Sequence, residues 1–125
     1  MAGPCSVEDE EQMVSTAKAV KKAGATVLRG GAFKPRTSPY SFRGMGEDGF
    51  KLLNLAKQET GLPIIPEVMA TDDVETVAKY ANPADRGTEY AELQPPRRGG
   101  IGRKPVMVKR GFAASYEEWL LLRST

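Results

Sequence analysis

The sequence predicts an α/β fold in which helices cover parallel strands, as in part of a (β/α)8 barrel. Short apolar runs alternate along the chain with segments of helical periodicity, a pattern typical of parallel sheets. Four polar residues, Cys5, Arg29, Glu67 and Lys109, each fall at or near the C-terminal end of a predicted strand. An open doubly wound sheet also fits the alternation, but in a barrel all strand C-termini face one mouth. We therefore expect about the first five βα units of a barrel, with the fourth disrupted.

The first half of the chain supplies two strands and two helices. A strand is expected to end near Cys5, and Ser6 is the predicted N-cap of a helix that stops at Gly24. A strand over residues 25–28 and a helix over residues 46–60 follow. Each helix ends at a glycine, which is the usual C-terminal signal.

The second half is less regular. Residues 62–69 form the next predicted strand, and Thr71 is the predicted N-cap of the helix after it. A valine-rich strand is expected over residues 104–109. Ser115 and Glu118 match a capping box ahead of a final helix.

Residues 82–102 break this pattern. They show no helical or strand periodicity and contain adjacent prolines and adjacent arginines. A loop of this length is unusual in an α/β domain. We expect the segment to be irregular and poorly packed.

The stretch at residues 28–39 concentrates groups that bind anions. Arg29, Lys34 and Arg36 supply fixed positive charge, and two adjacent glycines let backbone approach a ligand closely. Thr37 and its neighbouring serine add hydroxyl donors. The composition predicts a pre-shaped anion site at the end of a strand, with a solvated basic turn as the alternative.

The composition of the 125 residues narrows the class of protein. With 18 basic and 16 acidic residues, the chain lacks the basic excess of nucleic-acid-binding proteins. No apolar run approaches the roughly 20 residues of a membrane span, and no signal peptide precedes Gly3. The single cysteine excludes an internal disulfide and suits the cytoplasm. Because histidine is absent, these residues alone cannot complete a mechanism that needs one.

Residues 29–42 read Arg-Gly-Gly-Ala-Phe-Lys-Pro-Arg-Thr-Ser-Pro-Tyr-Ser-Phe, which closely resembles a loop of the 3-deoxy-D-arabino-heptulosonate 7-phosphate (DAHP) synthases. The resemblance runs from residue 2 to about residue 81 and resumes at residue 104. It implies a (β/α)8 barrel that joins phosphoenolpyruvate to erythrose 4-phosphate and releases phosphate, at the start of the shikimate pathway of aromatic biosynthesis. Members of the family are expected to be homo-oligomers without nucleic-acid or membrane partners.

The resemblance also implies substrate contacts. Arg29, Lys34 and Lys109 match the phosphoenolpyruvate ligands of the family, while Arg36 and Thr37 match contacts to the phosphate of erythrose 4-phosphate. Two alternatives stay open. The sibling family that makes the octulosonate 8-phosphate typically carries Lys-Ala-Asn-Arg where this chain has Lys-Pro-Arg at residues 34–36. The second alternative is a half-barrel that binds phosphate without catalysis.

Three residues carry the implied metal chemistry and catalysis. Cys5 matches a ligand of a divalent metal ion of the Mn, Fe, Co or Zn class. Without the flanking Gly-Pro and Ser, a small buried thiol would be the preferred interpretation of a lone cysteine. Lys34 and Glu67 are the predicted catalytic residues, with an ordinary helix-entry carboxylate as the alternative for Glu67. The other metal ligands of the family, a histidine and two carboxylates, lie on later strands. The metal site is therefore expected to be incomplete here, and the chain alone is not expected to make DAHP.

In this family the region of residues 82–102 would hold the fourth strand, ending in Gln-Ile-Gly-Ala-Arg-Asn-Met-Gln-Asn-Phe. Codons that the genetic code allows for residues 84–94 give this very sequence when they are read one base later. The hypothesis is that the segment is read out of frame, and the sequence of the underlying DNA decides it.

Overall fold

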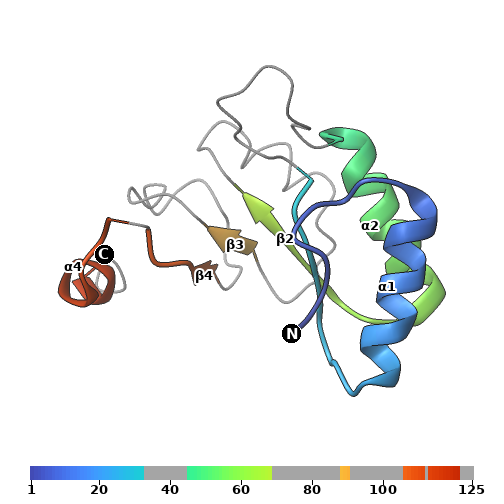
Figure 1. The fold of residues 1–125 in the computed structure, drawn as a ribbon, viewed down its shortest axis with the longest axis horizontal. Coiled ribbons are helices and arrows are strands. Elements are labelled where there is room, and N and C mark those ends of the chain that lie inside the picture. Colours follow the sequence, from blue (N-terminus) through green and yellow to red (C-terminus); the bar gives the residue numbers. More distant parts are fainter. Residues whose placement is uncertain (33–44, 69–87, 91–105, 112, 122–125) are drawn as a thin grey trace.

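A computed structural model describes residues 1–32, 45–68, 88–90, 106–111 and 113–121 (Figure 1). The described helices and strands follow each other in the order α1 (Glu10–Lys22), β1 (Leu28–Gly30), α2 (Glu47–Thr60), β2 (Ile64–Val68), β3 (Thr88–Tyr90), β4 (Val106–Val108) and α4 (Tyr116–Leu121). Within these residues, no helix is long and apolar enough to cross a bilayer.

The four strands form one parallel sheet in the order β1-β2-β3-β4. Before them, Ala2 makes a parallel bridge to Leu28, so the N-terminal segment extends the sheet beyond β1. The spatial order is thus the sequence order, whereas a doubly wound sheet reverses direction at a switch point. This arrangement confirms the α/β class and is the one that successive βα units of a barrel would have.

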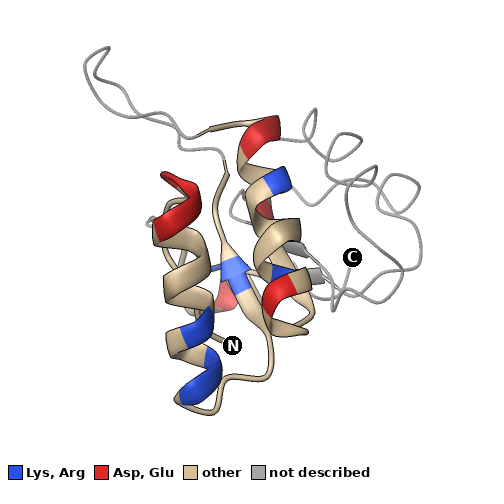
Figure 2. Ribbon diagram, turned by 90° about the vertical axis from the view of Figure 1, so that its right-hand side faces the viewer, with Lys and Arg blue, Asp and Glu red and all other residues tan. Residues whose placement is uncertain are grey.

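Helices α1 and α2 lie side by side on one face of the sheet (Figures 1 and 2). Their acidic first turns lie at the same end of this layer, where red segments mark them in Figure 2. In a βα unit the helix runs back against its strand, so the N-terminal ends of the helices lie near the C-terminal ends of the strands.

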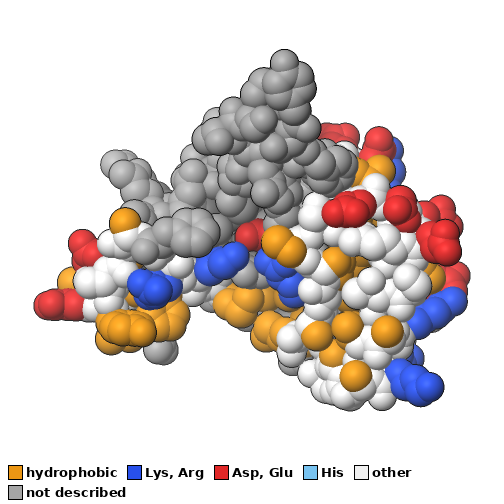
Figure 3. Space-filling model, in the orientation of Figure 1, with side chains coloured by type: hydrophobic (Ala, Val, Ile, Leu, Met, Phe, Trp, Pro, Cys, Tyr) orange, Lys and Arg blue, Asp and Glu red, His pale blue; other side chains and the backbone are white. Residues whose placement is uncertain are grey.

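The hydrophobic core fills the space between these two helices and the sheet. Its fully or almost fully buried side chains come from the N-terminal segment, both helices and the first two strands: Val7, Met13, Ala17, Leu28, Ala32, Phe50, Leu53, Ala56, Leu62 and Ile64. Elsewhere the described surface exposes apolar side chains, and Figure 3 shows such a group over β4 and α4, where Met107, Tyr116, Leu120 and Leu121 are exposed.

The start of α1 differs from the prediction. Asp9, and not Ser6, is the N-cap: its side chain accepts a hydrogen bond of 2.7 Å from the Gln12 backbone N–H. Ser6 precedes the helix, and Val7 still bonds to Gly31 of the neighbouring strand segment. The predicted stop is confirmed, because the helix ends at Lys22 and Gly24 has a φ of 95°.

Helix α2 agrees with the sequence closely. Gly46 is its N-cap, and Gly61 ends it in the left-handed conformation with a φ of 71°. Residues at helical spacing, among them Phe50 and Leu53, are buried against the sheet. The predicted capping box of α4 is also present: Glu118 accepts from the Ser115 backbone N–H at 2.7 Å, and Ser115 Oγ accepts from the Glu118 N–H at 3.1 Å.

Strand boundaries required correction. β1 begins at Leu28 and not at Ala25, since Leu28 is the first β1 residue that pairs with β2. The expectation of irregular structure throughout residues 82–102 is wrong at Thr88–Tyr90, which form β3 and pair with strands on both sides. The helix predicted after Thr71 lies outside the described residues.

Candidate anion site

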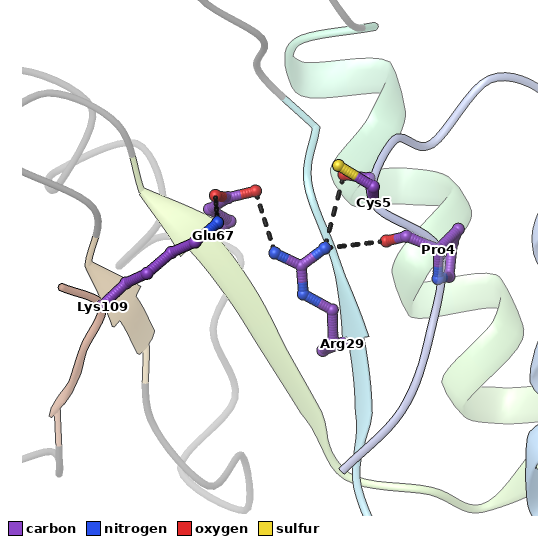
Figure 4. A network of polar contacts seen from close by, with 5 residues as sticks. All are labelled: Pro4, Cys5, Arg29, Glu67 and Lys109. Carbon is purple, nitrogen blue, oxygen red and sulfur yellow. Dashed lines mark hydrogen bonds and ion pairs between the residues drawn. The ribbon is translucent and has the colours of Figure 1, made fainter. Parts of the chain in front are cut away.

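Three charged side chains from separate parts of the chain meet on the face of the sheet opposite the helices (Figure 4). Arg29 comes from the middle of β1, Glu67 from the end of β2, and Lys109 directly follows β4. Leu28 belongs to the core on the helix side, and a Cβ on Gly30 would lie 2.8 Å from Leu53 Cδ2 of α2. Because side chains alternate along a strand, Arg29 points to the other face.

The carboxylate of Glu67 links the two cations. Arg29 Nη2 lies 3.1 Å from Glu67 Oε2, and Lys109 Nζ lies 3.5 Å from Glu67 Oε1. The Glu67 side chain is only 3% exposed, against 16% for Arg29 and 50% for Lys109. Burial of a carboxylate is costly unless it is paired, and here each oxygen has a cationic partner. Two cations and one carboxylate leave the group with net positive charge.

The ion pair between Lys109 and Glu67 also joins two strands that are not neighbours in the sheet. β2 and β4 are not neighbours, because β3 lies between them. Lys109 therefore reaches over β3 to contact Glu67 (Figure 4). Side chains that lie in or directly after different strands thus converge on one point, as the C-terminal ends of strands do at the mouth of a barrel.

The guanidinium of Arg29 has a second set of partners in the N-terminal segment. Its Nη1 donates to the backbone carbonyl of Pro4 at 3.0 Å and to that of Cys5 at 3.4 Å. The segment can approach this closely because residue 3 is glycine: a Cβ on Gly3 would lie 1.8 Å from the Arg29 carbonyl oxygen. Cys5 is exposed and lies next to the guanidinium (Figure 4).

The guanidinium of the neighbouring Arg110 contacts residues outside this cluster. Its Nη1 donates to the Ala114 carbonyl at 2.8 Å, and its guanidinium lies 5.4 Å from the ring centroid of Tyr116. The indole N–H of Trp119 donates to the Val108 carbonyl at 3.1 Å. These contacts fix the loop after β4, so that the two adjacent cations have different partners.

Four of the predicted site residues are therefore close together: Cys5, Arg29, Glu67 and Lys109. The positions of Arg29, Lys34, Arg36 and Lys109 predict that all four converge on one side of the sheet, and the partner shared by Arg29 and Lys109 confirms this for that pair. Lys34, Arg36 and Thr37 lie outside the described residues. The Pro4 carbonyl, a further partner of the site, could not be predicted from the sequence, because backbone acceptors have no side-chain signature.

The metal site remains a prediction. Among the described residues, no group of three or more histidine, cysteine, aspartate or glutamate side chains could hold a metal ion. Cys5 offers one thiol donor, and both oxygens of Glu67 already contact cations. The described residues thus do not by themselves fit a divalent metal.

A parallel sheet in sequence order, with cations gathered around a buried carboxylate, defines an α/β protein with a candidate anion site. Residues 1–124 match the DAHP synthetase I family. The chain belongs to this family.

Named relatives agree with this assignment. Over 122 residues the chain is 44% identical to phospho-2-dehydro-3-deoxyheptonate aldolase of Thermotoga maritima, covering 97% of the chain and 36% of the relative. It is 32% identical over 129 residues to 2-dehydro-3-deoxyphosphooctonate aldolase of Burkholderia multivorans, covering 94% of the chain and 44% of the relative.

Solved structures give the same result. The crystal structure of DAHP synthase from Thermotoga maritima superposes with a TM-score of 0.80 at 40% identity, covering 97% of this chain and 36% of that one. A truncated form of the same enzyme gives a TM-score of 0.72 at 36% identity, with 97% and 43% covered. The chain thus spans less than half the length of these relatives.

Proposed function

We propose that the chain is part of a DAHP synthase and that Arg29, Lys109 and Glu67 form the part of its active site that binds phosphoenolpyruvate. The observation that carries the proposal is the cluster of these three side chains at the strand ends of a protein of this family. The higher identity to the heptonate enzyme than to the octonate enzymes, 44% against 30–34%, supports DAHP over the eight-carbon product.

The charges suit this substrate, because phosphoenolpyruvate carries a phosphate and a carboxylate. The planar fork of Arg29 can donate to the oxygens of either group. Lys109 is half exposed and can turn toward an incoming anion while it stays near Glu67. Glu67 holds the Arg29 guanidinium in place and keeps Lys109 nearby before the substrate arrives, so less reorganisation is needed on binding.

In the proposed reaction the C3 carbon of phosphoenolpyruvate attacks the aldehyde of erythrose 4-phosphate, water adds at C2, and phosphate leaves by cleavage of the C–O bond. Arg29 and Lys109 bind and orient the anion, and Lys34, Arg36 and Thr37 are proposed to add further contacts. A divalent metal ion is the expected cofactor, with the Cys5 thiolate as one ligand. We further expect a cytoplasmic homo-oligomer.

Binding of phosphoenolpyruvate tests the proposal directly. Trp119 is the only tryptophan, and its indole bonds to the residue before Lys109, so its fluorescence should change on titration. Loss of a charge-assisted hydrogen bond should weaken binding about tenfold in Lys109→Ala. Lys51→Ala is the matched control, because Lys51 is an exposed lysine of α2 that pairs with Asp48.

Two outcomes would contradict the proposal: no titratable binding, or equal affinity in Lys109→Ala and in the parent chain. Phosphate release measured with erythrose 4-phosphate, and separately with a five-carbon aldose phosphate, distinguishes the two synthases. Because the chain alone is not expected to make DAHP, binding without release in either assay agrees with the proposal, and release by the chain alone would show that its site is completed in another way.

A further inference from the structure

We propose that Arg29 is also a positioning residue, which fixes the turn of residues 3–6 and with it the Cys5 thiol. This role goes beyond the proposed function, in which Arg29 binds substrate. It rests on that function only for the use of the thiol as a metal ligand.

The guanidinium joins the turn to the most deeply buried charge of the site. On one side Nη1 donates to the carbonyls of Pro4 and Cys5, at 3.0 and 3.4 Å. On the other side Nη2 contacts Glu67, whose side chain is 3% exposed. Because the guanidinium is a rigid plane, a fixed position on Glu67 also fixes where the two carbonyls can lie.

The ends of the turn are held separately, by the sheet and by α1. Before the turn, the Ala2 N–H donates to the Val27 carbonyl and the Arg29 N–H donates to the Ala2 carbonyl, both at 3.0 Å. After it, the Val7 N–H donates to Gly31 at 3.0 Å, and Gln12 Nε2 donates to the Ser6 carbonyl at 2.9 Å. Arg29 contacts the centre of the turn, next to the thiol, through the carbonyls of Pro4 and Cys5.

Lysine cannot replace arginine in this role. An ammonium group is a single point of charge, so it cannot contact Glu67 and both carbonyls through one rigid plane. Arg29→Lys therefore keeps the charge that an anion would meet and removes the geometry that positions the turn. This separates the positioning role from the electrostatic one.

The single cysteine gives a spectroscopic test. A nitroxide spin label on Cys5, which is exposed, should show a more mobile spectrum in Arg29→Lys than in the parent chain. In unlabelled protein, hydrogen exchange of the peptide covering residues 1–8 should be about tenfold faster, as expected for the loss of hydrogen bonds from a charged group. Lys109→Ala is the control, because Lys109 contacts Glu67 from the other side.

The proposal predicts that these changes in Arg29→Lys are confined to the N-terminal segment, so that hydrogen exchange in α2 is unchanged. In Lys109→Ala, both the spin-label spectrum and the exchange of residues 1–8 should be unchanged. It is overturned if Arg29→Lys leaves the spectrum and the exchange of residues 1–8 as they are. It is also overturned if exchange in α2 rises as much, since that would be general loosening of the fold. Neither readout requires metal, substrate or turnover, so failure of the proposed function would leave this result interpretable.

Discussion

Replacing Glu67 by alanine is expected to destabilise the fold by about 3 kcal/mol. Breaking a buried ion pair from one side costs roughly 3–5 kcal/mol, because the remaining charge is left without its partner. Arg29 would be that charge, with its side chain 16% exposed. We place the cost at the lower end of the range because Arg29 keeps the carbonyls of Pro4 and Cys5 as acceptors.

The matched control is Lys109→Ala, which breaks the other ion pair of the same carboxylate. The Lys109 side chain is half exposed, and pairs of this kind contribute at most about 1 kcal/mol. Urea unfolding followed by far-ultraviolet circular dichroism measures both variants, and equal m-values would show that the unfolding reaction is unchanged. The reasoning is refuted if Glu67→Ala costs less than about 1 kcal/mol, or if Lys109→Ala costs as much as Glu67→Ala.

Three further predictions concern local structure. Gly3→Ala should cost about 2 kcal/mol in urea unfolding through loss of two backbone hydrogen bonds, since the new Cβ would lie 1.8 Å from the Arg29 carbonyl oxygen; full stability would contradict this close approach. Thr60→Val should cost about 1–2 kcal/mol, because buried Thr60 Oγ1 accepts from the Leu62 N–H at 3.3 Å and donates to the Ala56 carbonyl at 2.7 Å, whereas Thr60→Ser should keep most of the stability. The hydrogen bonds from Ser115 lower the pKa of Glu118. The stability that ionised Glu118 adds to α4 is therefore fully present above the ordinary carboxyl pKa, and it is lost as the pH falls through the lowered pKa. Trp119 fluorescence should follow that loss, and Glu118→Gln, which has no carboxyl group to titrate, should remove it; an unchanged titration in this variant would exclude Glu118 as the cause.

Signals that lie within a few residues of each other were readable from the sequence. The glycines that end α1 and α2 and the reciprocal cap of α4 are local, because each depends on backbone groups one turn away. The error at the start of α1 was also local. Asp9 is followed three residues later by Gln12, a pattern that matches a capping box, and this signal would have favoured Asp9 over Ser6.

The extents of the strands could not be read in the same way. β1 begins where a partner in β2 begins, and the apolar run of residues 25–28 contains no information about that partner. β3 has three residues between two strands that pair with it, so its neighbours determine it and its own periodicity does not. Tertiary pairing of this kind overrides local propensity.

The candidate site likewise has one part that could be predicted from the sequence and one part that depends on tertiary structure. The residue types and their places at strand ends predicted that Arg29 and Lys109 would converge. That both would contact one buried carboxylate follows from Lys109 reaching over β3, which depends on the shape of the sheet. The contacts of Arg29 with backbone carbonyls depend on the close approach at Gly3. No pattern of side chains in the sequence predicts this approach.

The agreement between strand order and chain order has a consequence for synthesis on the ribosome. Each described strand pairs with the one that was made before it, beginning with the bridge from Ala2 to Leu28. Among the described strands, each new one adds at the same edge of the sheet, whereas in a doubly wound sheet of order 3-2-1-4-5-6 the fourth strand adds at the opposite edge. The sheet can therefore grow at one edge while the chain emerges, with Arg29 and Glu67 leaving the ribosome before Lys109 does.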